Sequence, residues 1–212
     1  MKKILCVFCC MAVIGLTSCL GDSDNNNQGL SPQEVSQCFN TIKGNYTGKV
    51  LFENLNPNDV YDYIDTLDIA WSVAADTTIV VNQFPQTVIL DRISDQQMKE
   101  ALEQAAPAPL KAKIGFYESD PIRFMLYPYS VTYDVEYQDA PHKVSLVFWI
   151  NTYSFGKYDT SSRVFQMQLM AAGLYLDEDT THNYLLNSAY DNSSIPIIIT
   201  NVNLSKEIDS IT

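Results

Sequence analysis

The side chains that could carry out acid–base, nucleophilic or metal chemistry are few in this chain of 212 residues. It contains five Cys and two His, His142 and His182. His182 follows Asp179 by three residues, from which a carboxylate–imidazole metal site could be drawn, but a solvated acidic loop at 177–179 is the favoured interpretation. The sequence has no G-x-S-x-G, H-E-x-x-H or Gly-rich phosphate motif, and its 25 acidic residues make any choice of a carboxylate pair arbitrary. We therefore predict no catalytic residue, no metal, no cofactor and no enzyme activity.

A run of alternating aromatic residues offers binding chemistry instead. From Tyr127 to Tyr137 every second residue is Tyr or Val, so in a strand they would share one face. Tyr combines a flat apolar ring with a hydroxyl, which suits sugars and other amphipathic ligands. The alternative interpretation is a packed core, which we favour for most of the run. Tyr127, Tyr129 and Tyr133 are the candidate rim of a ligand site.

The N-terminus has the layout of an export signal. Lys2 and Lys3 precede an apolar stretch, Ile4–Leu16, that is shorter than a membrane-spanning helix. It runs into Leu16-Thr17-Ser18-Cys19, which resembles the bacterial lipobox, where the Cys thiol receives a diacylglycerol and becomes the new N-terminus. The alternative is an ordinary secretory signal followed by a chance Cys. The resemblance implies that Cys19 is the lipidation site and that the N-terminal lipid holds the protein on a membrane.

The lipobox implies a division of the chain and a location. We expect a signal peptide at 1–18, the lipidated Cys and a flexible tether at 19–30, and a single β-rich domain at 31–212. Because Leu20 rather than Asp follows Cys19, the outer membrane is the expected destination, on its periplasmic face or at the cell surface. Only Cys38 then remains as a thiol in the domain, which excludes an intramolecular disulfide.

The composition limits the kinds of molecule that the protein could bind. A net charge of −12 and the lack of a basic run argue against binding to nucleic acid. No feature identifies a protein partner. Four tripeptides of the form Asp-Ser/Thr-x resemble the O-glycosylation acceptor of Bacteroidetes, although Asp and Thr are also ordinary turn residues. The candidate acceptors are Thr66, Thr77, Thr180 and Ser210.

The periodicity predicts a mainly β fold. Ser31-Pro32-Gln33-Glu34 is a helix start with a capping box, and the helix places Cys38 on its apolar face. A second helix is expected from Asp95, capped by Ser94, to about Ala106. About eight or nine strands follow one another through short turns, which favours an antiparallel sheet. They include extended segments at Phe84–Leu90 and Val144–Phe155 and a final strand at Ile195–Leu204, whose Pro196 suggests a sheet edge.

The layout resembles small envelope lipoproteins of unknown function in gut Bacteroidetes. The residues that carry this resemblance are the lipobox, the Asp/Asn-rich tether, the capped helix and the segment Gly44-Asn45-Tyr46-Thr47-Gly48. This G-x-Y-x-G segment is also similar to the opening strand of calycin-like, or lipocalin-like, barrels, a resemblance that implies a barrel around an apolar ligand. A β-sandwich or an open antiparallel sheet packed by helices is the alternative fold.

The sequence leaves three functions open. The first is a non-catalytic module that binds a small apolar or glycan-like ligand. The second is a structural lipoprotein that docks on an envelope complex through an exposed apolar patch. The third and weakest is an acid–base hydrolase.

Overall fold

The fold is given by a computed structural model that describes residues 29–53, 64–185 and 195–202. The expected signal peptide and Cys19 lie outside these residues. Two α-helices, a 3-10 helix and ten strands make up the described part. In chain order the elements are α1 (Pro32–Ile42), β1 (Gly44–Glu53), β2 (Ile64–Ala74), β3 (Thr78–Phe84), η1 (Gln86–Arg92), α2 (Gln96–Glu103), β4 (Ala108–Ser119), β5 (Ile122–Pro128), β6 (Val131–Tyr137), β7 (Ala140–Trp149), β8 (Asn151–Asp159), β9 (Val164–Leu176) and β10 (Ile195–Thr200).

The strands form a closed antiparallel barrel, which confirms the predicted mainly β class and excludes the alternative of a sandwich or open sheet. Eight strands close in the order β1-β2-β3-β4-β5-β8-β9-β10. Closure occurs at β10, which pairs with β1 through Lys49↔Thr200 and with β9 through Ile197↔Leu169. The sequence suggested that Pro196 marks an edge strand, and this is wrong because β10 is paired on both sides. Pro196 lies beyond the three positions that pair with β1, so its missing N–H is not needed there.

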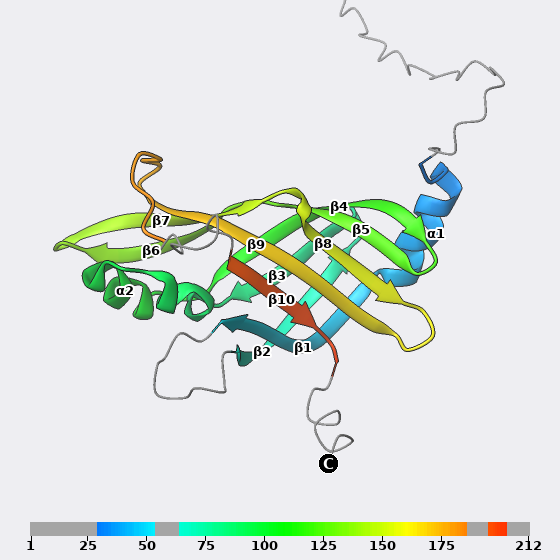
Figure 1. The fold of residues 1–212 in the computed structure, drawn as a ribbon, viewed down its shortest axis with the longest axis horizontal. Coiled ribbons are helices and arrows are strands. Elements are labelled where there is room, and N and C mark those ends of the chain that lie inside the picture. Colours follow the sequence, from blue (N-terminus) through cyan, green and yellow to red (C-terminus); the bar gives the residue numbers. More distant parts are fainter. Residues whose placement is uncertain (1–28, 54–63, 186–194, 203–212) are drawn as a thin grey trace, which may run out of the picture.

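The two remaining strands form a hairpin that extends the sheet beyond the barrel. β6 pairs with β7, and β7 pairs with the C-terminal half of β9. In Figure 1 this hairpin and α2 lie at one end of the long axis, and α1 lies at the other end. The predicted alternation is confirmed in β6, where Val131, Tyr133, Val135 and Tyr137 are buried and the residues between them are exposed.

The segment predicted as one extended strand, Val144–Phe155, is in fact two strands that meet at Ile150. Trp149 pairs with Met170 of β9, but the next paired position is Phe155 with Gln168. The five residues 150–154 therefore lie opposite a single residue of β9, Leu169. The Ser154 hydroxyl bridges this irregularity because it donates to the Trp149 carbonyl and accepts from the Met170 N–H.

The interior of the barrel is filled by aromatic side chains in mutual contact. The Phe165 ring lies 4.9 Å from Tyr46, 5.6 Å from Phe124 and 5.8 Å from Trp71, measured between ring centroids. Phe124, Phe165 and Trp71 are all buried. These packed rings contribute a large share of the apolar area that stabilises the domain, at about 25 cal/mol per Å². The wall of the barrel thus surrounds a hydrophobic core.

The first helix follows its sequence signals closely. Ser31 Oγ accepts from the Glu34 N–H at 3.3 Å, and the Ser31 N–H donates to Glu34 Oε2 at 2.8 Å, which completes the predicted capping box. Cys38 is buried on the apolar face, as predicted. Burial also raises the pKa of its thiol, which disfavours the nucleophilic thiolate. None of the described helices is long and apolar enough to span a membrane.

Two local predictions differ from the structure. The second helix is capped by Asp95 rather than by Ser94, because Asp95 Oδ1 accepts from the Met98 N–H at 2.9 Å. The segment predicted as extended, Phe84–Leu90, leaves β3 at Phe84 and turns into η1. Val88, Ile89 and Leu90 are all buried in that helix, so a continuous apolar run was mistaken for a strand.

A Gly48→Ala substitution tests the tight closure of the barrel. A methyl group at Gly48 would collide with the backbone carbonyl of Thr200, at the junction of β1 and β10. We expect the free energy of unfolding to fall by about 1–3 kcal/mol, as for other overpacked sites, in chemical denaturation. Gly115→Ala is the control, because its methyl would meet only the exposed ring of Tyr127, at 3.1 Å. Equal stability of the two variants would contradict the closure described above.

Candidate functional site

The three tyrosines of the predicted rim do not lie together on the surface. Tyr127 and Tyr129 are 40 % and 55 % exposed. Tyr133 is buried in the core, with its hydroxyl 3.5 Å from the Phe84 carbonyl oxygen, so it cannot form an exposed rim. Burial raises its phenol pKa far above the usual value. The chain leaves β5 at Pro128 and enters β6 at Val131. This break separates the exposed Tyr127 and Tyr129 from the buried Tyr133, although all three fall on alternate positions of one sequence run.

A cluster of exposed aromatic residues lies on the outer wall of the barrel, over β4, β5, β8 and the end of β7. We call it the aromatic face. Trp149 and Tyr153 are in contact, with ring centroids 6.1 Å apart. Each member is between 40 % and 54 % exposed, although large aromatic side chains usually prefer burial. The members are Tyr117, Tyr127, Trp149, Tyr153 and Phe155.

The backbone explains why these rings point outward. Phe116 pairs with Phe124 and Glu118 pairs with Arg123, which leaves Tyr117 as the extra residue of a bulge in β4. Bulges redirect side chains and are frequent beside functional sites. Tyr153 lies in the second irregularity, between β7 and β8. Neither the bulge at Tyr117 nor the irregularity at Tyr153 was predicted from the sequence, because a change of register cannot be recognised from alternation alone.

A groove of about 280 Å³ lies at the part of the aromatic face formed by Tyr117 and Phe155. We call it the lateral groove. Tyr117 and Phe155 provide its rings, and Arg123 and Lys157 provide its positive charges. Gln166 and Gln168 on β9 provide amide groups, and Gln168 Nε2 donates to the Tyr153 carbonyl at 3.2 Å. The groove therefore combines flat apolar surfaces with donors and acceptors on a rigid sheet.

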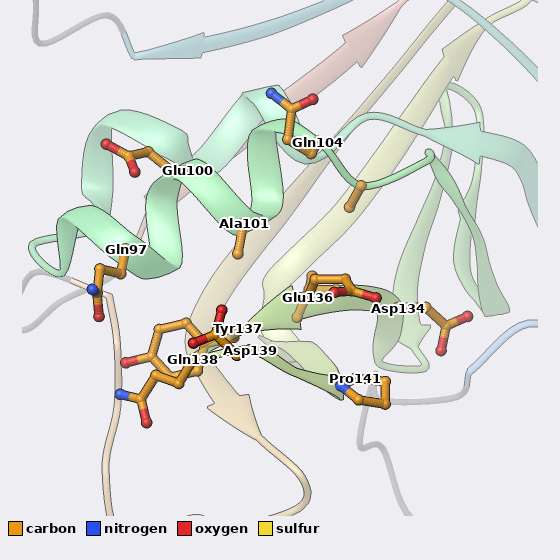
Figure 2. A pocket seen from close by; sticks show the side chains of 12 residues that line it. Gln97, Glu100, Ala101, Gln104, Asp134, Glu136, Tyr137, Gln138, Asp139 and Pro141 are labelled. Carbon is orange, nitrogen blue, oxygen red and sulfur yellow. The ribbon is translucent and has the colours of Figure 1, made fainter.

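A second, wider cleft of about 590 Å³ lies between α2 and the β6–β7 hairpin. Figure 2 shows Ala101 on the side of α2 that faces the hairpin. Several carboxylates line this cleft, among them Glu100, Glu136 and Asp139, together with amides of Gln97 and Gln104. Asp134, which also lines the cleft, binds Lys143 at 2.7 Å. The Tyr137 ring also lines this cleft, but it is buried, unlike the exposed rings of the lateral groove.

The two histidines have separate partners. His142 lies within β7, and its Nδ1 is 2.6 Å from Asp177 Oδ2. The His182 ring packs edge-on against Tyr184, with centroids 4.4 Å apart. Asp179 accepts from both the backbone and the hydroxyl of Thr181, and no hydrogen bond or ion pair among the described residues joins it to His182. Within the described ranges no group of three or more His, Cys, Asp or Glu could hold a metal ion.

The candidate glycosylation acceptors differ in accessibility. Thr66 on β2 and Thr180 are exposed. Thr77 is half-buried in a turn with φ 59°, and its hydroxyl donates to the Asp76 carbonyl at 2.6 Å. Ser210 lies outside the described residues. Modification of these positions remains a prediction.

The fold and the site define a class: a closed antiparallel β-barrel whose candidate site is an aromatic groove on the outer wall. Residues 41–176, from the end of α1 to the end of β9, match the family model "Domain of unknown function (DUF4840)". The chain belongs to this family. Comparison with curated proteins found no match, and comparison with solved structures found none either.

An Asp177→Asn substitution tests the link between β7 and the turn after β9. The Lys143 backbone N–H and the His142 ring, both hydrogen-bonded to Asp177, lower the pKa of this carboxyl below its usual 3.8. A lowered carboxyl pKa stabilises the folded state above pH 3.8, and this contribution is lost as the pH falls through and below that value. We expect the variant to have a Tm a few degrees lower at pH 7, and the difference from wild type to shrink as the pH falls below 3.8.

Thermal unfolding followed by circular dichroism measures this difference. Glu136→Gln is the control, because this exposed carboxylate on β6 has no side-chain hydrogen bond or ion pair with another described residue. It should leave the Tm at pH 7 unchanged. An Asp177→Asn variant as stable as wild type at pH 7 would contradict the proposed link.

Proposed function

We propose that this protein is a lipid-anchored, non-catalytic binding module whose aromatic face binds a glycan. The observation that carries the proposal is the lateral groove, in which Tyr117 and Phe155 lie beside amide and cationic side chains. The barrel serves as the rigid scaffold, and the N-terminal lipid holds it at the bacterial outer membrane. The function of the family itself is unknown, and its match brings no reaction.

The chemistry of the groove suits sugars better than purely apolar ligands. A pyranose ring presents an apolar C–H face, which packs on a flat aromatic side chain, and a rim of hydroxyls that need hydrogen-bond partners. Tyr117 and Phe155 supply the first kind of contact. Gln166, Arg123 and Lys157 supply donors for the second.

The packing of the barrel also favours an exterior site. A calycin-like resemblance implied a ligand inside, but the Phe165, Phe124 and Trp71 rings occupy the space between the strands. A ligand on the outer wall does not have to displace this core. Oligosaccharides are extended, so a groove on an open face can accept a section of a longer chain.

The anchoring part of the proposal depends on the N-terminal sequence. Lys2, Lys3 and the apolar stretch before Leu16-Thr17-Ser18-Cys19 support export and lipidation at Cys19. The residues between Cys19 and α1 would then link the lipid to the barrel, and their Asp, Asn and Gly content suits a hydrophilic tether. Stable anchoring by such a lipid requires more than one acyl chain.

Removing rings from the aromatic face tests glycan binding. The full chain, purified in a mild detergent, is screened on an oligosaccharide array, and hits are measured by isothermal titration calorimetry. We expect Phe155→Ala and Tyr117→Ala to weaken binding at least about tenfold, since a stacked ring is worth roughly 1 kcal/mol beyond its buried area. The Tm should stay close to wild type, because both side chains are substantially exposed.

Ile64→Ala is the matched control for that experiment. Ile64 is 54 % exposed on β2, away from the groove, so its removal should leave affinity unchanged. Array hits with the same affinity in the Phe155→Ala and Tyr117→Ala variants would contradict the site. No hit on the array, together with self-association that these variants abolish, would favour the docking alternative.

A Cys19→Ser substitution tests the anchor. In a bacterial host with lipoprotein processing, we expect wild type to lose residues 1–18, gain the mass of its acyl chains and sediment with membranes. The variant should keep an unlipidated mass and fail to be cleaved before position 19. Intact-mass spectrometry distinguishes these forms, and a wild-type mass without lipid would contradict lipidation. The same spectra show whether sugar mass is added at the candidate acceptors.

A further inference from the structure

Two positive side chains stand side by side on the outer wall of the barrel. Arg123 on β5 is the direct register partner of Lys157 on β8, and both are exposed. Directly opposed side chains of neighbouring strands have Cβ atoms about 5 Å apart, where like charges destabilise the sheet. Like charges at this spacing repel, so the arrangement costs stability unless an anion lies beside it.

The surrounding charges show how this pair is balanced. Several cations on the sheet lie next to carboxylates, as Lys49 does with Asp68 at 2.8 Å and Lys113 with Asp76 at 2.9 Å, whereas Lys43, Lys111 and Arg163 form no ion pair with another described residue. Lys157 has no carboxylate within ion-pair distance among the described residues. Arg123 contacts Glu118 through Nε at 3.3 Å. Glu118 therefore balances Arg123 but not Lys157, and the three side chains together keep a net positive charge.

The neutral neighbours of this pair extend the same row across the sheet. Lys157 pairs with Gln166, and Phe155 in the next outward row pairs with Gln168. All of them line the lateral groove with Tyr117. A ligand in the groove would therefore meet rings, amides and two cations within a few strand spacings of each other.

We propose that the lateral groove selects glycans that carry carboxylated sugars, with Arg123 and Lys157 on the two adjacent strands holding the carboxylate. This inference rests on the proposed glycan-binding function and names the ligand class of the same site. The planar guanidinium of Arg123 can donate two parallel hydrogen bonds to a carboxylate, and the Lys157 ammonium adds a point charge beside it. A sugar carboxylate between the two side chains would offset the like-charge contact between Arg123 and Lys157.

The overall charge of −12 does not oppose this assignment. At physiological salt the Debye length is about 8 Å, so distant carboxylates are largely screened from the groove. Charges within the groove act at shorter range and are reinforced by hydrogen bonds. The acidic surroundings instead disfavour highly charged polyanions, because these would extend beyond the basic pair.

Matched acidic and neutral sugars test the proposal. Titration calorimetry on the full chain in mild detergent compares a galacturonate trimer with the galactose trimer of the same linkage, and a glucuronate-containing oligosaccharide with its glucose counterpart. We expect at least one uronate to bind about tenfold more tightly than its neutral partner at low salt, and the difference to shrink at high salt.

Substitutions assign the preference to the two cations. Lys157→Gln and Arg123→Gln should each remove most of the preference for the uronate, because they lower the affinity for the uronate far more than the affinity for the neutral sugar. Lys111→Gln is the control. Lys111 is also an exposed residue of β4, but it lies about 20 Å from Tyr117 along the strand. It should behave as wild type.

The outcomes separate the two proposals. Equal binding of uronate and neutral sugars, lost in Phe155→Ala, would overturn the carboxylate preference and leave glycan binding intact. A preference that survives in the Arg123→Gln and Lys157→Gln variants would also overturn it. A sulfated galactose trimer that binds as tightly as the galacturonate trimer would show a general anion site instead. Absence of binding to every sugar on the array and in these pairs would overturn both proposals.

Discussion

The structure depends on the double pairing of β10. This six-residue strand joins β1 to β9 and converts an open sheet, with two unprotected edges, into a barrel. Its inward residues Ile195, Ile197 and Ile199 are buried. Its one Pro, Pro196, lies outside the positions that pair with β1. Closure fixes which face of every strand points inward. It thereby decides which side chains on β4, β5 and β8 remain on the outer wall as a site.

The candidate site arises where the regular barrel ends. β9 is long enough to pair with β8 and β10 in its first half and with β7 in its second half. The change of partner forces the irregularity between Trp149 and Phe155, and this places Trp149 and Tyr153 in solvent. Such departures from regular pairing leave backbone groups without their ladder partners, which costs stability. Here the Ser154 hydroxyl provides hydrogen bonds to the Trp149 carbonyl and the Met170 N–H. The geometry of the barrel thus produces the aromatic face.

Local signals predicted local structure well, and register-dependent features not at all. The capping box of Ser31, the burial of Cys38 and the alternation in β6 each depend on a few neighbouring residues, and each is confirmed. The barrel itself was predicted from the number of strands and the opening segment at Gly44. In contrast, the burial of Tyr133 against the exposure of Tyr127 depends on where β5 ends. The juxtaposition of Arg123 and Lys157 depends on the pairing of β5 with β8, which brings together two residues more than thirty positions apart in the chain.

One strand carries both the stability and the proposed binding, because its side chains alternate. In β8 the inward positions Ser154, Gly156 and Tyr158 are buried, whereas Phe155 and Lys157 are exposed between them. Gly156 leaves room for the Phe124 ring, which packs against Phe165 in the core. The outward positions can therefore change without creating a cavity, and the inward ones cannot. Because the barrel interior is filled and the proposed site lies on the outer wall, the residues that stabilise the fold differ from those that would determine ligand specificity.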